Sequence, residues 1–150
     1  MTHRVSRAMG AIGLVLVLAG ADLAAQKADA ARAEALICLA RAARDRGDAV
    51  QATKHFREAA RLQTFEGPLL VEYFWAAHQA NAHEAPVIAD RVLSANPAER
   101  AVRDGAIGLA VKARDEARAR RLSAEGARVE PGVLLWSRRL GESALRVGAW

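Results

Sequence analysis

Apolar residues recur three and four positions apart along most of this chain, which is the spacing of amphipathic helices. The clearest example predicts two helices within residues 36–62, with apolar positions at Leu36, Leu39, Ala40, Ala43, Ala52, Phe56, Ala59, Ala60 and Leu62. Between them, Gly47 can adopt the left-handed conformation that ends a helix, and the Asp48 carboxylate can cap the next one. We therefore expect a helical hairpin with Phe56 in its core.

The same arrangement recurs twice more. A second pair of helices is predicted from Leu70, Tyr73, Phe74, Ala77, Ala85, Ala89, Val92 and Leu93, with its turn at Asn81. A third is predicted from Ile107, Gly108, Val111, Ala119, Leu122, Gly126 and Ala127, with its turn at Arg114-Asp115. Pro97 and Pro131 follow these two pairs and lie 34 residues apart. A generic alanine-rich bundle would explain the helical periodicity, but not this repeated spacing of turns and prolines.

The first pair resembles the tetratricopeptide repeat, a 34-residue helix–turn–helix unit. It matches the motif at Leu36, Leu39-Ala40 and Ala43 in the first helix, and at Ala52 and Phe56 in the second. Thr64 stands where the family has proline. The resemblance covers about residues 31–147 and implies an all-α fold, an α-solenoid of antiparallel helix pairs with about three and a half repeats. The last half-repeat, with Trp136, Leu140 and Ala144, is expected to be a C-terminal capping helix.

In tetratricopeptide proteins the first helix of each repeat lines a concave groove that holds a peptide or a partner helix. The resemblance therefore implies groove residues at Arg41, Arg44, Val71, Trp75, His78, Gln79, Leu109 and Lys112, with Ile37 and Gly105 beside them. Trp75 is the main anchor candidate, because Trp and Arg dominate binding hot spots. Plain packing of Trp75 against the neighbouring helix is the alternative. The basic groove residues suit a partner with acidic residues, although the asparagine–lysine pairs of carboxylate-clamp grooves are missing.

The first 25 residues have the three parts of a secretory signal peptide. Arg4 and Arg7 are followed by an uncharged stretch at residues 8–21 and by the small residues Ala24 and Ala25. Cleavage is expected after Ala25, or alternatively after Ala30, leaving a repeat domain at residues 26–150. An uncleaved anchor at residues 8–21 is the other possibility, although this stretch rises only about 21 Å as a helix, against about 30 Å of hydrocarbon. The sequence thus predicts an exported protein, either periplasmic or secreted.

Composition favours helices, and the sequence contains no recognisable catalytic motif. The 36 alanines, against 19 valine, isoleucine and threonine residues, favour helix over sandwich, barrel or parallel sheet. Cys38 is the single cysteine, and its position beside Ile37 predicts a small buried residue. The histidines lack the spacing of metal ligands on a helix, and no nucleophile elbow, phosphate loop or dinucleotide fingerprint occurs. We therefore expect no metal, no cofactor and no enzymatic activity.

Charge adds a second candidate surface. The formal net charge is +5, and one predicted helix carries Arg114, Arg118, Arg120, Arg121 and Arg128. A solvated outer face explains this cluster, and a patch for an acidic partner or anionic lipid is the alternative. Nucleic acid is not expected as a partner. The predicted function is a non-catalytic adaptor or assembly factor in the bacterial cell envelope. The alternatives are a structural subunit of an envelope complex or homo-oligomer, an undetected hydrolase, and a small-ligand binder.

Overall fold

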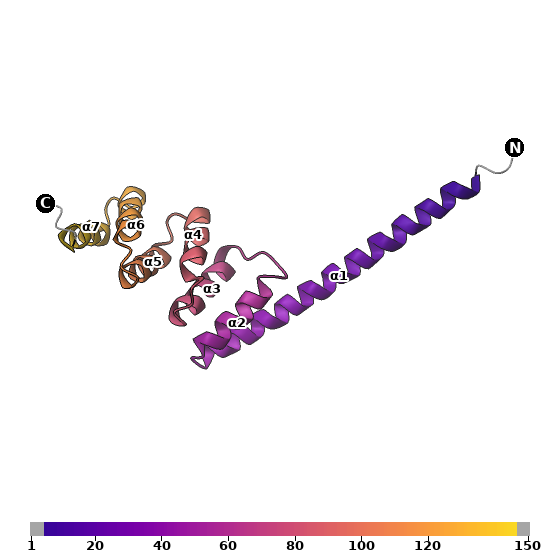
Figure 1. Ribbon diagram of the computed structural model, residues 1–150, viewed down its shortest axis with the longest axis horizontal. Coiled ribbons are helices and arrows are strands. Elements are labelled where there is room, and N and C mark those ends of the chain that lie inside the picture. Colours follow the sequence, from indigo (N-terminus) through magenta and orange to yellow (C-terminus); the bar gives the residue numbers. More distant parts are fainter. Residues whose placement is uncertain (1–4, 147–150) are drawn as a thin grey trace.

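The computed structural model describes the backbone of residues 5–146 and the side chains of residues 23–142. Within residues 5–146 every regular element is a helix: α1 (Val5–Asp45), α2 (Ala49–Ala59), α3 (Gly67–Gln79), α4 (Ala85–Ala95), α5 (Arg100–Lys112), α6 (Glu116–Val129) and α7 (Leu134–Arg146). The prediction of an all-α chain is therefore confirmed. Each helix packs against the next one in the chain, and α3 also contacts α5 (Figure 1).

Helix α1 is much longer than the others, and its N-terminal part extends beyond the remaining helices (Figure 1). Its side chains are exposed from residue 23 to residue 32, and Ala33 is the first to be buried. The predicted signal peptide at residues 1–25 and the alternative anchor at residues 8–21 fall almost wholly outside the side chains that are described. Within residues 23–142, no helix is both long enough and apolar enough to cross a bilayer.

Three helical hairpins share one kind of turn. Each contains a residue with a left-handed backbone, namely Gly47 (φ 78°), Asn81 (φ 51°) and Arg114 (φ 58°). The next residue donates its N–H to the carbonyl five positions earlier, in the pairs Asp48 to Ala43, Ala82 to Ala77 and Asp115 to Ala110. These bonds satisfy carbonyls that the helix end would otherwise leave free. The three predicted turns are confirmed, and their left-handed residues lie 34 and 33 positions apart.

Helix starts follow from local chemistry. The Asp48 carboxylate accepts a hydrogen bond from the Gln51 N–H at 3.0 Å, and Asp115 accepts one from the Arg118 N–H at 3.0 Å. These bonds satisfy donors in the first turns of α2 and α6. Helices α3 and α4 instead carry proline in the first turn, where the missing N–H has no helical partner to lose.

An apolar core runs through all of the hairpins. In the first half it centres on Phe56, Phe65 and Tyr73, whose ring centroids are 5.8–6.2 Å apart. Phe56 is fully buried, as predicted. Phe65 is equally buried but lies in the connection between α2 and α3, outside any helical periodicity, and the sequence pattern did not reveal it.

Glycines on α5 and α6 make room for large rings. A β-carbon on Gly105 would lie 3.1 Å from Phe74 Cζ and 3.3 Å from Trp75 Cη2. Trp136 of α7 is fully buried over Gly126 of α6, which agrees with the predicted capping role of that helix. The sequence pattern places Gly126 on the packed side of its helix and Gly105 beside the groove, and the structure shows both as contact points between helices.

The buried side of α1 differs from the expected one. Ile37 is 7% exposed, whereas Leu39 is 52% exposed and Cys38 is exposed as well. The predictions of a buried Cys38, a core Leu39 and a groove-facing Ile37 are therefore wrong. The buried positions follow Ala33, Ile37 and Ala40. Because alanine lies on nearly every side of this helix, the apolar pattern alone does not define which side packs.

Helix α5 shows a smaller shift of the same kind. Gly108 is exposed, so the prediction of a core position there is wrong, whereas Val111 is half-buried and packs against the core. Ile107 is buried as expected. The core also includes Arg103, whose guanidinium donates to the carbonyl oxygens of Pro97 and Leu122. A buried arginine is a polar interruption of the apolar stripe, which is why periodicity did not locate it.

Candidate interaction surface

Two arginines of α1 bind one carboxylate of α3. The Arg41 Nε and Nη2 atoms each donate to a Glu72 oxygen at 2.9 Å, and Arg44 Nη1 donates to the same carboxylate at 3.1 Å. The hydrogen bond from Arg41 is the main reason why the pKa of Glu72 is lowered, and it acts against the effect of burial. The same bond raises the pKa of Arg41. Both predicted groove arginines therefore already have an acidic partner within the chain.

Trp75 lies on α3 about one turn beyond Glu72. It is half-buried, so part of its side chain stays exposed. Its ring centroid is 4.9 Å from that of Phe74 and 5.3 Å from that of His78. We call the sides of α1, α3 and α5 that carry Arg41, Glu72, Trp75 and Gly105 the odd-helix face. It combines a partly exposed aromatic cluster with a charged network.

The other predicted groove residues are less closely associated. Val71 and Leu109 are half-buried and pack against the core, and Gln79 is exposed. Lys112 is exposed and donates a hydrogen bond to Asn81 Oδ1 at 2.5 Å. Among the described side chains, neither Gln79 nor Lys112 makes a hydrogen bond or ion pair with the Trp75 and Arg41 groups. The predicted residues therefore form two clusters rather than one continuous site. Arg41 and Arg44 meet at Glu72, and Trp75 lies beside His78.

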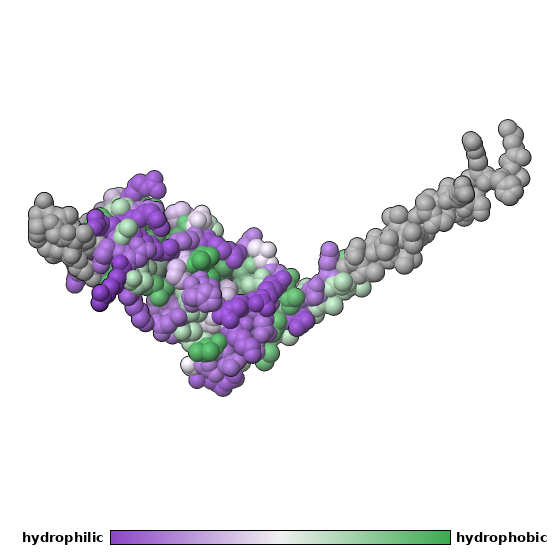
Figure 2. Space-filling view, in the orientation of Figure 1, coloured by the Kyte–Doolittle hydropathy of each residue, from purple (hydrophilic) through white to green (hydrophobic). Residues whose placement is uncertain are grey.

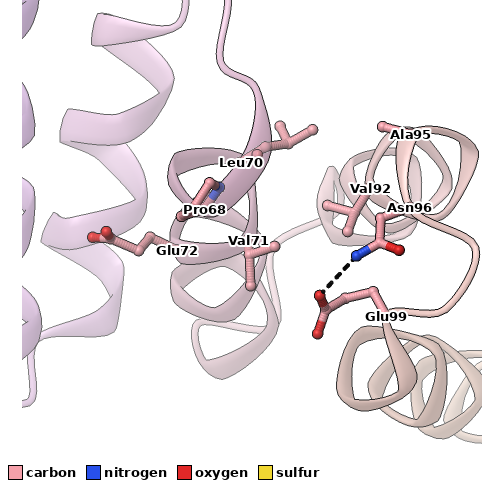
Figure 3. Close-up of a pocket in the computed structure, with 9 residues that line it drawn as sticks. Pro68, Leu70, Val71, Glu72, Val92, Ala95, Asn96 and Glu99 are labelled. Carbon is pink, nitrogen blue, oxygen red and sulfur yellow. Dashed lines mark hydrogen bonds between the residues drawn. The ribbon is translucent and has the colours of Figure 1, made fainter.

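A cavity of about 350 Å³ lies at the N-terminal end of α3, next to the odd-helix face (Figure 3). Its lining includes Leu70 and Val71 of α3, Val92 and Ala95 of α4, and Asn96 and Glu99 of the following connection. Glu72 also contributes, but Figure 3 shows its carboxylate directed toward α1, whereas the Glu99 side chain points toward Val71.

Sequence reasoning did not identify the acidic members of this region. Glu72 and Glu99 are single acidic residues at a helix face and a helix start, where charged side chains are common and carry no distinctive motif. The signal that was available for Glu72 was its position on the predicted inner face of α3, between Val71 and Trp75. An acid in that position opposite Arg41 and Arg44 could have been predicted to pair with them.

The arginine-rich helix α6 is partly structural. Arg118 donates to Asp90 at 2.8 Å and to the Pro86 carbonyl at 2.9 Å, which ties α6 to α4. Arg121 and Arg128 are exposed and lie seven residues apart, which puts them along one side of the helix, and Arg114 is exposed in the turn before it. The surface of the hairpins is largely hydrophilic on the face that Figure 2 shows, with small separate apolar patches.

Among residues 23–142, no group of three or more His, Cys, Asp or Glu side chains is placed to hold a metal ion. Comparison of the chain with protein-family models finds no family that matches, and comparison with curated proteins finds no match either.

Proposed function

We propose that this protein is a tetratricopeptide-like α-solenoid that acts as a non-catalytic interaction module, with a peptide or partner helix bound on the odd-helix face. The observation that carries the proposal is Trp75, a large aromatic side chain that stays partly exposed beside His78 on α3. The left-handed turns at intervals of 34 and 33 residues support the repeat architecture. Each hairpin then contributes its first helix to a common face, as in repeat proteins generally.

The charged network suits a partner with an acidic residue near Trp75. The two guanidinium groups of Arg41 and Arg44 face the single carboxylate of Glu72, so the positive charges exceed the negative by one among these three side chains. Asp45 lies 3.4 Å from Arg44 but is largely exposed, so its ion pair is weak. Glu72 already holds Arg41 in place. Less side-chain entropy is therefore lost when a partner binds to Arg41.

The same proposal includes export to the periplasm or the medium, on the basis of the signal-peptide pattern in residues 1–25. Membrane contact would then be confined to that segment, before cleavage or as an anchor at residues 8–21. Mass spectrometry of the protein recovered from the periplasm or medium should find an N-terminus at Gln26 or Ala31. Intact Met1 in the membrane fraction would instead support the anchor.

A peptide library selected on the full-length protein tests the binding function. Selected peptides should bind Trp75→Ala about 30-fold more weakly, the change expected for a hot spot worth about 2 kcal/mol. Val50→Ala, on the exposed side of α2, serves as the matched control and should bind as the wild type does. Circular dichroism establishes that both variants are folded. If folded Trp75→Ala binds every selected peptide undiminished, the odd-helix face is not the binding surface, and the exposed arginines of α6 become the next candidate.

A further inference from the structure

The cavity beside α3 differs in charge from the rest of the molecule. The whole chain has a formal net charge of +5, yet the residues that line this cavity include two glutamates and no lysine or arginine. Its floor is apolar, formed mainly by Leu70, Val71 and Val92 (Figure 3). A site with an apolar floor and an acidic rim favours a ligand that has an apolar body and a positive end.

Glu99 is the carboxylate available to such a ligand. Glu72 already binds Arg41 and Arg44, whereas the hydrogen bond shown for the Glu99 carboxylate comes from the neutral amide of Asn96, at 3.3 Å. Glu99 is also the N-cap residue of α5, but its side chain makes no capping bond. The carboxylate therefore has acceptor capacity left and points toward the cavity (Figure 3).

The ends of the neighbouring helices add partial charges of both signs near this cavity. Helix α4 ends at Ala95, so carbonyls of its last turn present partial negative charge on the same side as Asn96. The N-terminal ends of α3 and α5 oppose this with partial positive charge of about half a unit each. Together the two N-terminal ends offset about one unit of negative charge, which is the charge on Glu99, and the C-terminal end of α4 leaves the balance negative by about half a unit, so a cation remains favoured there.

We propose that this cavity receives a lysine or arginine side chain of the bound partner, with its aliphatic stem on Leu70, Val71 and Val92 and its charged end at Glu99. The inference rests on the proposed function, because the cavity adjoins the odd-helix face through Val71 and Glu72. A volume of about 350 Å³ is at the small end of the range of ligand sites, which begins at about 300 Å³. A wholly apolar occupant would desolvate the Glu99 carboxylate and leave it with only the neutral Asn96 amide as a partner, and an acidic one would be repelled.

n-Butylguanidinium, which reproduces an arginine side chain, is the direct probe. Titrated into the full-length protein, it should shift the backbone amide resonances of Gly67, Val71, Asn96 and Glu99. Valerate, which is similar in length but anionic, should leave them unchanged.

Glu99→Gln should weaken binding of the cation about fivefold or more, because a charge-assisted bond becomes a neutral one. Glu34→Gln, at an exposed position of α1, is the matched control. The proposal is overturned by equal shifts with valerate, by no shifts in these residues, or by unchanged binding in Glu99→Gln.

Selected peptides separate this inference from the proposed function. Changing one basic residue of a bound peptide to methionine should weaken binding to the wild type, and this change should have little further effect on Glu99→Gln. If peptides depend on Trp75 but not on their basic residues or on Glu99, the side-chain pocket is wrong and the interaction function stands. If no peptide depends on Trp75, the proposed function fails, and a response to n-butylguanidinium would then show a cation site without a partner.

Discussion

The indole of Trp136 packs directly over Gly126. A β-carbon on Gly126 would lie 2.7 Å from Trp136 Cδ2 and 2.9 Å from Arg103 Cδ, which is closer than van der Waals contact allows. Neither neighbour can move easily, because Trp136 is fully buried and Arg103 is held by the carbonyls of Pro97 and Leu122. Gly126 therefore sets the distance between α6 and α7.

Gly126→Ala should lower the free energy of unfolding by about 1–3 kcal/mol, the usual effect of overpacking a core. Alanine is the better helix former by about 1 kcal/mol, so the expected loss is a net effect. Gly108→Ala is the matched control, since Gly108 is exposed in α5 and its β-carbon would meet open space. That variant should be up to about 1 kcal/mol more stable than the wild type. Urea unfolding measures both, and equal changes would show that α7 does not pack on Gly126.

Phe56→Ala should be strongly destabilising. The ring of Phe56 is fully buried against Phe65 and Tyr73, and truncation of a buried phenylalanine typically lowers stability by about 3–5 kcal/mol. Val50→Ala, on the exposed side of the same helix, should change stability by less than about 0.5 kcal/mol. An unchanged melting temperature in Phe56→Ala would contradict the position of the core.

Large side chains explain where the sequence predicted the fold correctly. In α3 the bulky residues Leu70, Tyr73 and Phe74 define one side of the helix, and all three are buried as predicted. In α1 the alternative sides differ by little more than alanine, and there the predicted core was wrong at Leu39 and Ile37. The turns were predictable because Gly47 and Asn81 are residue types that adopt the left-handed backbone readily.

The candidate site was only partly predictable for a different reason. The partial exposure of Trp75 follows from its helical phase relative to Phe74, which is local information. The Glu72 network and the cavity at Glu99 depend on contacts between separate helices. Glu72 is 31 residues from Arg41 along the chain, and the cavity is lined by residues of α3, α4 and the start of α5. Such juxtapositions require the packing of the hairpins, which periodicity does not provide.

The Glu72 network should make stability depend on acid pH. Because the folded protein holds the pKa of Glu72 below its unfolded value of about 4.3, the contribution is fully present above that pH. It is lost as the pH falls through the lower, folded-state pKa. Glu72→Gln should therefore be about 0.5–1 kcal/mol less stable than the wild type at pH 7, given partly exposed ion pairs. The difference should shrink when unfolding is measured progressively below pH 4. A difference independent of pH would contradict the role of the Glu72 charge.

The left-handed turns test whether a β-carbon is unfavourable at positive φ, because one can be added at Gly47 and one removed at Arg114. Arg114 has φ 58° and Gly47 has φ 78°, in turns with the same hydrogen bonds. A residue with a β-carbon is disfavoured in this conformation by about 1–2 kcal/mol, whereas glycine is not. Arg114→Gly should therefore raise the free energy of unfolding, by up to about 1 kcal/mol after the greater flexibility of the unfolded glycine chain is subtracted. Gly47→Ala should lower it by about the same amount, and steric contact cannot be the cause because a β-carbon on Gly47 would meet no atom within 4 Å. Urea unfolding of the two variants should give changes of opposite sign. Destabilisation by Arg114→Gly would mean that the arginine side chain stabilises its turn by more than the backbone conformation disfavours it.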